Sequence, residues 1–188
     1  YRENLQGLQI LLEAVRGARV PRFVFASSAA VYGTPETDLL TEETPCLPTT
    51  PYGETKLAGE WLVRATGRAH GISTACLRAV NVAGTADPLL ADTNGASLLP
   101  MTFEYLHAGS PARILGDDYP TRDGTCERDF LHVADLAAAH LAAAQALTDQ
   151  PTPEHLTVNV SRGESVSVRE MIRAVCEVTG HTRLRPRT

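Results

Sequence analysis

Helix-like and strand-like segments alternate along this chain, and no other feature restricts its possible folds as strongly. Residues 4–16 repeat leucine and valine at the spacing of an amphipathic helix. The short apolar run 22–26 follows, and such runs are typical of a buried strand in a parallel sheet. A second helix is expected over residues 51–70 and a second strand over residues 73–80. Helix and strand in this repeated order predict an α/β fold with a parallel sheet.

Capping signals mark the ends of two expected helices. Thr50 suits the N-cap and Pro51 the first position of the helix over residues 51–70. Near the end of the chain, Ser167 and Glu170 have the spacing of a capping box, and Gly180 is suited to close that helix. The elements expected between these helices are a helix over 98–107, a short strand over 113–115, a strand over 130–133, an alanine-rich helix over 135–147 and a strand over 156–160.

Composition and charge exclude several classes of protein. The chain has 188 residues, 43% of them hydrophobic, which is enough for one domain or two small lobes with a core. A formal net charge of −5 does not suit a nucleic-acid-binding surface, and no apolar stretch is long enough to span a bilayer. Four scattered cysteines without a CxxC pair indicate reduced thiols in a cytoplasmic protein; they are Cys46, Cys76, Cys126 and Cys176.

Tyr52 and Lys56 are the most informative pair of residues in the sequence. Four positions apart at the start of a helix, they share one helical face, where an ammonium stabilises a phenolate that accepts a proton. Ser28 ends the first expected strand, and ligands of open α/β sheets bind at the carboxyl ends of strands. Taken singly, the pair could be a surface aromatic–cation contact and Ser28 a turn serine. Together the three residues predict a proton-transfer site.

Two motifs resemble those of the extended short-chain dehydrogenase/reductase superfamily: Phe-Ala-Ser-Ser-Ala-Ala-Val-Tyr-Gly over residues 25–33 and Pro-Tyr-Gly-Glu-Thr-Lys over residues 51–56. The segment 116–130, continued by residues 132–136, resembles the signature loop of UDP-glucose 4-epimerases within the NAD-dependent epimerase/dehydratase family. The resemblance covers essentially the whole chain. It implies the C-terminal part of a Rossmann-like doubly wound parallel sheet, together with part of a smaller α/β substrate-binding lobe.

The resemblance implies roles for individual residues. Ser28, Tyr52 and Lys56 match the catalytic serine, the catalytic base and the lysine that binds the nicotinamide ribose of NAD; the serine and the tyrosine also contact the cofactor and the substrate. Asn4 and Val80 match further NAD contacts, with Val80 against the nicotinamide. The remaining substrate-binding residues implied are Asn81 at the sugar nucleotide, Ser97, Leu98 and Leu115 at the uridine and phosphate, and Arg128 at the diphosphate.

The implied activity is the NAD-dependent interconversion of UDP-glucose and UDP-galactose through a transient 4-keto sugar. A nucleotide-sugar 4,6-dehydratase or a UDP-glucuronate decarboxylase would share the serine, tyrosine and lysine. A 4,6-dehydratase usually carries acid–base carboxylates next to the serine, where this chain has Ala29 and Ala30. A non-catalytic dinucleotide-binding protein is a more distant alternative, and such proteins typically lack the tyrosine or the lysine.

Three further features have structural explanations that compete with functional ones. The aspartates at 117, 118 and 123 lack the spacing of a metal loop, so we expect a polar turn and no metal. Arg128 could form a structural ion pair with the aspartate after it instead of gripping a diphosphate. His132 is expected to be a hydrogen-bonded core residue rather than a catalyst.

The resemblance also bears on the extent of the chain. Dinucleotide-binding folds of this kind open with a glycine-rich fingerprint, and none of the 14 glycines lies in one. We therefore expect an internal fragment: residues 1–84 as the second part of the NAD-binding domain and 85–188 as an incomplete substrate-binding lobe, with about 126–148 packing back on the former. The fragment by itself is expected to bind NAD weakly and to be inactive, and the intact protein to be a homodimer.

Overall fold

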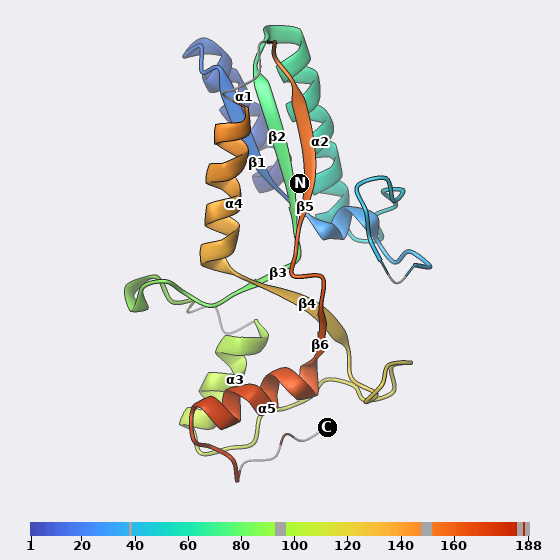
Figure 1. Ribbon diagram of the computed structural model, residues 1–188, viewed down its shortest axis with the longest axis vertical. Helices are drawn as coiled ribbons and strands as arrows, with labels where there is room; N and C mark the ends of the chain where they lie inside the picture. The colour runs from blue at the N-terminus through green and yellow to red at the C-terminus, as the bar shows by residue number, and fades with distance from the viewer. Residues whose placement is uncertain (38, 93–96, 148–151, 184–185, 187–188) are drawn as a thin grey trace. The chain divides into compact units, whose positions relative to one another are not determined.

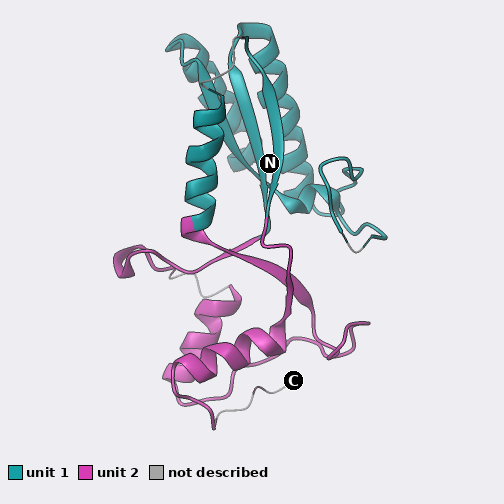
Figure 2. Cartoon of the chain, viewed as in Figure 1, with its two compact units in different colours: residues 1–80, 135–160 teal, residues 81–134, 161–188 magenta. Residues whose placement is uncertain are grey.

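The computed structural model describes residues 1–37, 39–92, 97–147, 152–183 and 186, and the chain divides into two compact units (Figure 2). Unit 1 consists of Tyr1–Val80 and Asp135–Val160, and unit 2 of Asn81–Ala134 and Ser161–Thr188. Each unit combines helices with a small sheet, so the predicted α/β class is confirmed. The assignment of an NAD-binding part and a substrate-binding part stays a prediction, because compactness does not report on ligands.

The sheet of unit 1 is parallel, with strand order β1-β2-β5 (Figure 1). Its strands are β1 (Arg22–Ser28), β2 (Ser73–Ala79) and β5 (His155–Val160). The central strand β2 is buried along its whole length. β1 was expected to be buried, but Ser27 is its one buried residue, because β1 pairs with β2 alone among the described strands.

Helices α1 and α2 cover one face of this sheet. The helical elements of unit 1 are the π-helical turn η1 (Arg2–Gln6), α1 (Gly7–Gly17), the 3-10 turn η2 (Ala29–Tyr32), α2 (Pro51–His70) and most of α4 (Val133–Ala146). A shared core joins α1, α2 and β2 through Leu8, Leu12, Val63 and Cys76, with the half-buried phenylalanines of β1 packed against it. Burial of these apolar side chains is the main force that holds the two helices on the sheet.

The predicted ends of α2 are confirmed. The Thr50 hydroxyl accepts the Gly53 N–H at 3.1 Å, Pro51 occupies the first helical position, and Gly71 follows the helix with φ +67°. A positive φ is costly for residues with a Cβ atom, so glycine is well suited to end the helix there. The start of this helix, which carries Tyr52, is therefore fixed by local sequence.

Unit 2 contains a sheet of strand order β3-β4-β6, in which β3 is parallel and β6 antiparallel to β4. Its elements are β3 (Asn81–Ala83), the 3-10 turn η3 (Pro88–Leu90), α3 (Leu98–His107), β4 (Glu127–His132), β6 (Ser165–Ser167) and α5 (Val168–Val178). The capping box of α5 is present, and Gly180 follows the C-cap residue Thr179 with φ +76°.

One predicted element of unit 2 is wrong. Residues 113–115 form no strand; Arg113 makes an isolated bridge, while Ile114 is buried in a core with Leu106 of α3 and Ile172 of α5. The apolar side chain that suggested a strand thus packs between helices without joining a hydrogen-bonded ladder.

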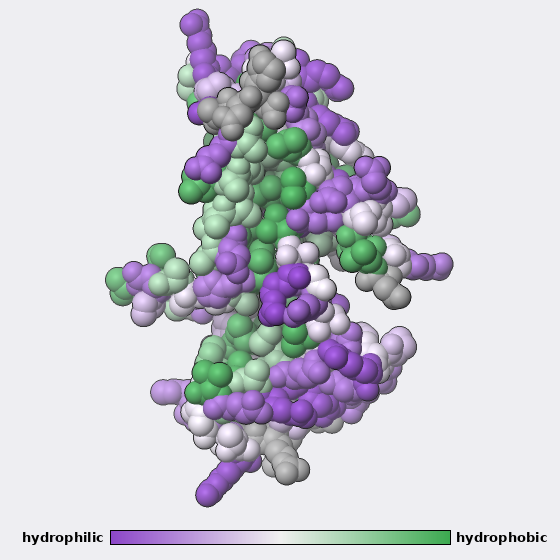
Figure 3. All heavy atoms as spheres, viewed as in Figure 1, coloured by the Kyte–Doolittle hydropathy of each residue, from purple (hydrophilic) through white to green (hydrophobic). Residues whose placement is uncertain are grey.

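Helices α4 and α5 present different surfaces. Figure 3 shows the alanine-rich α4 as a mildly hydrophobic surface and α5 as a largely hydrophilic one, and no residue of α4 is buried. Within the described ranges, no helix is both long enough and apolar enough to cross a membrane.

Candidate active site

Ser28 lies where β1 ends and the turn η2 begins. Its backbone is still extended, and its Oγ accepts the N–H of Ala30 at 3.2 Å, so the serine is the N-cap of η2. This local bond fixes the side chain while its own O–H remains able to donate. The structure therefore presents a half-buried hydroxyl at the carboxyl end of a parallel strand, as the sequence predicted.

Tyr52 and Lys56 lie on the first two turns of α2. The Tyr52 side chain is half exposed, and the Lys56 Nζ lies 5.6 Å from the centre of its ring. The same ammonium donates to the carbonyl oxygen of Ala26 in β1 at 2.9 Å and lies 5.2 Å from the Phe25 ring. Partial burial lowers the pKa of Lys56, because an apolar environment disfavours its charge. The lysine thus links α2 to the strand that ends in Ser28.

Gly53 lets α2 approach the serine turn closely. A Cβ atom at this position would overlap the carbonyl oxygen of Ala30 and lie 3.0 Å from the Cβ of Pro48. Helix α2 packs against both η2 and β1. The closeness of the Tyr52 helix to the Ser28 turn therefore depends on the absence of a side chain at Gly53.

Asn4 joins this group through a residue that the sequence did not single out. Its Nδ2 donates to the Oγ1 of Thr55 at 2.8 Å, and Thr55 donates to the backbone oxygen of Tyr52 at 2.8 Å. Val80 follows β2 directly, next to the register partner of Ser28. Four of the predicted residues, Asn4, Ser28, Tyr52 and Lys56, are thus gathered around the start of α2 and the end of β1, and Val80 lies at the same edge of the sheet.

In unit 2, Leu98 and Leu115 line one hollow of about 200 Å³. Its other lining residues are Met101, Thr102, Tyr105, Arg113, Ile114, Gly116, Cys126 and Val168. Ser97 comes directly before Leu98 in the chain. It is the exposed N-cap residue of α3, and its side chain makes no capping hydrogen bond. Apolar walls with a single cation at the edge suit a flat, partly polar group such as a nucleobase.

Arg128 of β4 is exposed and forms no ion pair with any described residue. One nitrogen, Nη1, donates to the Glu127 backbone oxygen at 3.0 Å. The competing Arg–Asp pair is not found, since the Asp129 carboxylate accepts the N–H groups of Arg162 and Gly163 at 3.2 and 2.8 Å. Asn81 of β3 contacts β4, the strand of Arg128: its Nδ2 donates to the Asp129 carbonyl at 3.3 Å. Asn81 and Arg128 therefore lie on neighbouring strands of one sheet.

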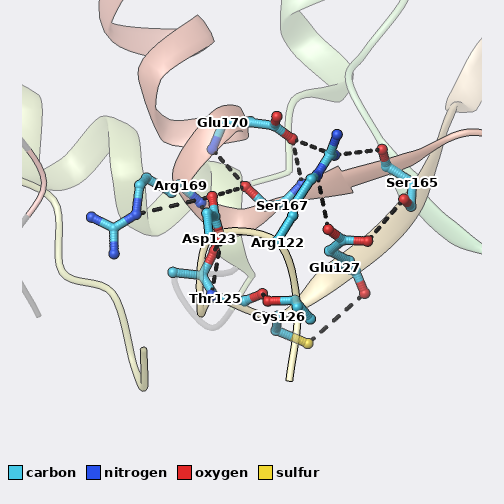
Figure 4. Close-up of polar contacts among 10 residues, drawn as sticks. Arg122, Asp123, Thr125, Cys126, Glu127, Ser165, Ser167, Arg169 and Glu170 are labelled. Carbon is cyan, nitrogen blue, oxygen red and sulfur yellow. Dashed lines mark hydrogen bonds and ion pairs between the residues drawn. The ribbon is translucent and has the colours of Figure 1, made fainter. Parts of the chain in front are cut away.

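The loop before Arg128 is tied to the start of α5 (Figure 4). Asp123 accepts the Ser167 hydroxyl at 2.6 Å and the Thr125 hydroxyl at 2.7 Å, and these bonds lower the pKa of Asp123 from 3.8 to about 2. Arg122 bridges Glu127 at 2.9 Å and Glu170 at 2.8 Å. Asp123 thus has a structural role in a polar turn, and across the described residues no group of three potential metal ligands is found.

His132 and the four cysteines are the remaining candidate residues of the sequence, and none of them was expected to be catalytic. His132 is exposed rather than in the core, and its Nδ1 accepts the Ala134 N–H at 3.1 Å, which caps the start of α4. None of the four cysteines is in a disulfide, in agreement with the expected reduced thiols. Burial raises the pKa of Cys76 to about 12, which leaves this thiol protonated and poorly nucleophilic.

Comparison with known proteins identifies the family of the chain. Residues 1–160 match the model of the NAD dependent epimerase/dehydratase family. The chain is 43% identical over 180 residues to a UDP-glucose 4-epimerase of Streptomyces lividans, covering 95% of this chain and 54% of the relative. It is 40% identical over 185 residues to a UDP-glucose 4-epimerase of Azospirillum brasilense, covering 96% and 52%. The chain spans about half the length of the curated relatives it matches.

A solved structure supports the same fold. The UDP-glucose 4-epimerase of Stenotrophomonas maltophila, determined with bound NAD and formylated UDP-arabinopyranose, superimposes with a TM-score of 0.88 at 35% identity. The match covers 100% of this chain and 57% of the neighbour. The Rossmann-like architecture expected from the sequence is therefore confirmed for the part of the fold that the chain contains.

Proposed function

Because this chain belongs to the NAD dependent epimerase/dehydratase family, we propose that the whole protein interconverts UDP-glucose and UDP-galactose by 4-epimerisation, with NAD as its cofactor. The observation that carries the proposal is the group formed by Ser28, Tyr52 and Lys56 at the carboxyl end of a parallel sheet. Ligands of open α/β sheets bind at that edge. The relatives named as UDP-glucose 4-epimerases supply the substrate class of the proposal.

The reaction needs a cofactor because the hydrogen on C4 of a sugar is not acidic. NAD supplies the hydride acceptor and donor that such a carbon requires. The residues at the start of α2 fit this cofactor, because the Lys56 ammonium and the Tyr52 phenol can both hydrogen-bond to hydroxyl groups. Asn4 is held beside them by its hydrogen bond to Thr55, which lies between Tyr52 and Lys56 in the sequence. We assign Lys56 to the ribose hydroxyls, and Asn4 and Val80 to further contacts with the cofactor.

Tyr52 is the proposed base that takes the proton of the C4 hydroxyl, directly or through Ser28. The half-exposed phenol can reach a ligand, and it shares one helical face with the Lys56 ammonium, which lies 5.6 Å from the centre of its ring. The Ser28 hydroxyl can relay the proton, because its oxygen already accepts from Ala30 and its O–H is left to donate.

The nucleotide part of the substrate is assigned to residues of unit 2. The planar Arg128 guanidinium carries several N–H donors suited to diphosphate oxygens, and it has no ion-pair partner among the described residues. Asn81 is assigned to the sugar nucleotide. Leu98, Leu115 and Ser97 are assigned to the uridine, since the first two line the apolar hollow.

We also propose that the intact protein is a cytoplasmic homodimer. Four cysteines with no disulfide among them suit a reducing compartment. Trp61 and Leu62 of α2 are 56% and 38% exposed, and exposed large apolar side chains on one helix favour a protein interface. A monomeric mass for the full-length protein by light scattering would contradict the dimer.

Product identity separates the proposed reaction from those of sibling enzymes. The full-length protein should convert UDP-galactose into UDP-glucose. It should form no decarboxylated product from UDP-glucuronate and no dehydrated product from nucleotide-linked glucose. Release of such a product, without epimerisation, would assign the same serine, tyrosine and lysine to a decarboxylase or a dehydratase.

A further inference from the structure

One face of α2 binds two consecutive residues of the strand that ends in Ser28. Lys56 and Glu60 are one helical turn apart and share a face with Tyr52. Lys56 Nζ donates to the Ala26 carbonyl at 2.9 Å, and the Glu60 carboxylate accepts the Ser27 hydroxyl at 2.5 Å. The helix that carries the proposed base is therefore bonded to β1 at the two residues immediately before Ser28.

Glu60 is also held by Arg78 of β2. Arg78 donates from Nε to one Glu60 oxygen at 2.9 Å and from Nη2 to the other at 2.7 Å, and both side chains are less than a tenth exposed. Arg78 is the register partner of Ser27 on one side and of Asn159 in β5 on the other. The residues therefore form one polar row across the sheet, under α2.

Tyr32 closes this row from the turn η2. Its hydroxyl accepts Arg78 Nη1 at 2.8 Å and donates to the Asn159 Oδ1 at 2.6 Å, and the Arg78 guanidinium lies 4.9 Å from its ring centre. Every element that carries or borders the proposed proton-transfer group thus contributes to the network: β1 through Ser27, α2 through Glu60 and η2 through Tyr32.

Stability is a weak explanation for this buried pair. Taking two charges out of water is costly, and replacing buried ion pairs by apolar residues of similar size is often neutral or stabilising. What a bidentate pair does supply is a fixed geometry, because a planar guanidinium and a carboxylate bond in few orientations. Proton transfer depends on such fixed geometry, since a misplacement of about 1 Å can lower a rate by about 100-fold.

We propose that Glu60 is a positioning residue, which together with Ser27 and Arg78 holds α2 against the carboxyl end of β1 and so sets Tyr52 relative to Ser28. The proposal rests on the proposed epimerase function for its kinetic test. Its structural content, that these contacts fix the start of α2, stands independently and has its own measurement.

The first variant is Ser27→Ala in the full-length protein, which cuts the bond between Glu60 and β1 and leaves the ion pair intact. We expect kcat for UDP-galactose to fall by about 10- to 100-fold while KM stays within about threefold. The matched control is Ser73→Ala. Ser73 is equally buried, at the opposite end of the same sheet, where its Oγ accepts the Glu154 N–H at 3.4 Å. This control should keep the wild-type kcat.

The second variant, Glu60→Leu with Arg78→Met, separates positioning from stability. Removing both charges avoids an unpaired buried ion, so the variant should fold with a melting temperature close to that of the wild type. If the pair were merely structural, a stable variant would keep its activity. If Glu60 positions α2, kcat falls at least as far as in Ser27→Ala although stability and bound NAD are retained.

Hydrogen exchange of residues 51–57 supplies a readout that needs no epimerase activity. Positioning predicts faster exchange there in both variants, with wild-type exchange in β2 and in Ser73→Ala. Wild-type exchange over 51–57 in both variants would overturn the proposal, whatever the kinetics. Should the wild type fail to epimerise, the proposed function fails, and the exchange comparison still decides the role of Glu60.

Discussion

The close approach of α2 to the Ser28 turn gives a prediction whose size follows from the structure. In Gly53→Ala, the new Cβ atom would lie 3.1 Å from the Ala30 carbonyl carbon and would overlap its oxygen. Ordinary contacts between carbon and a carbonyl oxygen are about 3.3–3.6 Å, so the helix and the turn must separate by about 1 Å. The clash involves backbone atoms, which cannot rotate away as the end of a side chain can.

This separation moves Tyr52, the neighbour of Gly53, away from Ser28. A shift of about 1 Å in a reacting group can cost about 100-fold in rate, so we expect kcat to fall by about 10- to 100-fold. The free energy of unfolding should fall by no more than about 1–3 kcal/mol from overpacking, partly offset by the gain of about 1 kcal/mol in helix propensity. Binding of a UDP-sugar should change little, because Gly53 lies in unit 1 and the residues assigned to the nucleotide lie in unit 2.

The assay is the steady-state conversion of UDP-galactose to UDP-glucose by the full-length protein, with urea denaturation alongside. Gly7→Ala is the matched control, since Gly7 is also helical and a Cβ there meets no atom within 4 Å. The control should keep the wild-type kcat and gain about 0.5–1 kcal/mol of stability. A wild-type kcat in folded Gly53→Ala would refute the dependence of the reaction on this close approach.

Two further predictions concern unit 2. Arg128→Ala should weaken binding of a UDP-sugar by about 10- to 100-fold, since charge-assisted hydrogen bonds contribute about 1.5–3 kcal/mol, and calorimetry of the full-length protein would measure it. An unchanged affinity would remove Arg128 from the diphosphate site. Asp123→Asn should destabilise the fold most above about pH 4, because the Ser167 and Thr125 hydroxyls lower the folded pKa of Asp123 from 3.8 to about 2. The difference in unfolding free energy between wild type and variant should shrink as the pH falls from about 4 to 2, and a difference that stays constant over that range would contradict the assigned cause.

The sequence was most informative where local rules decide the structure. The bounds of α2 follow from Thr50, Pro51 and Gly71, whose roles depend on their immediate neighbours. The capping box at Ser167 and Glu170 is local in the same sense. The spacing of Tyr52 and Lys56 was enough to place both on one helical face, and the end of β1 at Ser28 followed from the apolar run before it.

What the sequence did not reveal depends on contacts between distant segments. The strands β3 and β6 have three residues each, too few for any periodicity to be recognised. The network around Glu60 joins Tyr32 to Asn159, which are 127 positions apart. Two signals for it were nevertheless present: Arg78 is a charged residue inside an otherwise uncharged strand, and Glu60 continues the helical face of Lys56. A buried charge needs a partner, and Glu60 is a carboxylate on the helix that covers that strand.

The most direct test of the proposed chemistry is to incubate the full-length protein with UDP-galactose, without added NAD, and to follow the formation of UDP-glucose. We expect conversion by the wild type, and a loss of about 10²- to 10⁴-fold in kcat in Tyr52→Phe, with binding of the nucleotide sugar retained. Equal rates in the two proteins would contradict the assignment of Tyr52 as the base, and with it the proposed role of the end of β1 and the start of α2 in proton transfer.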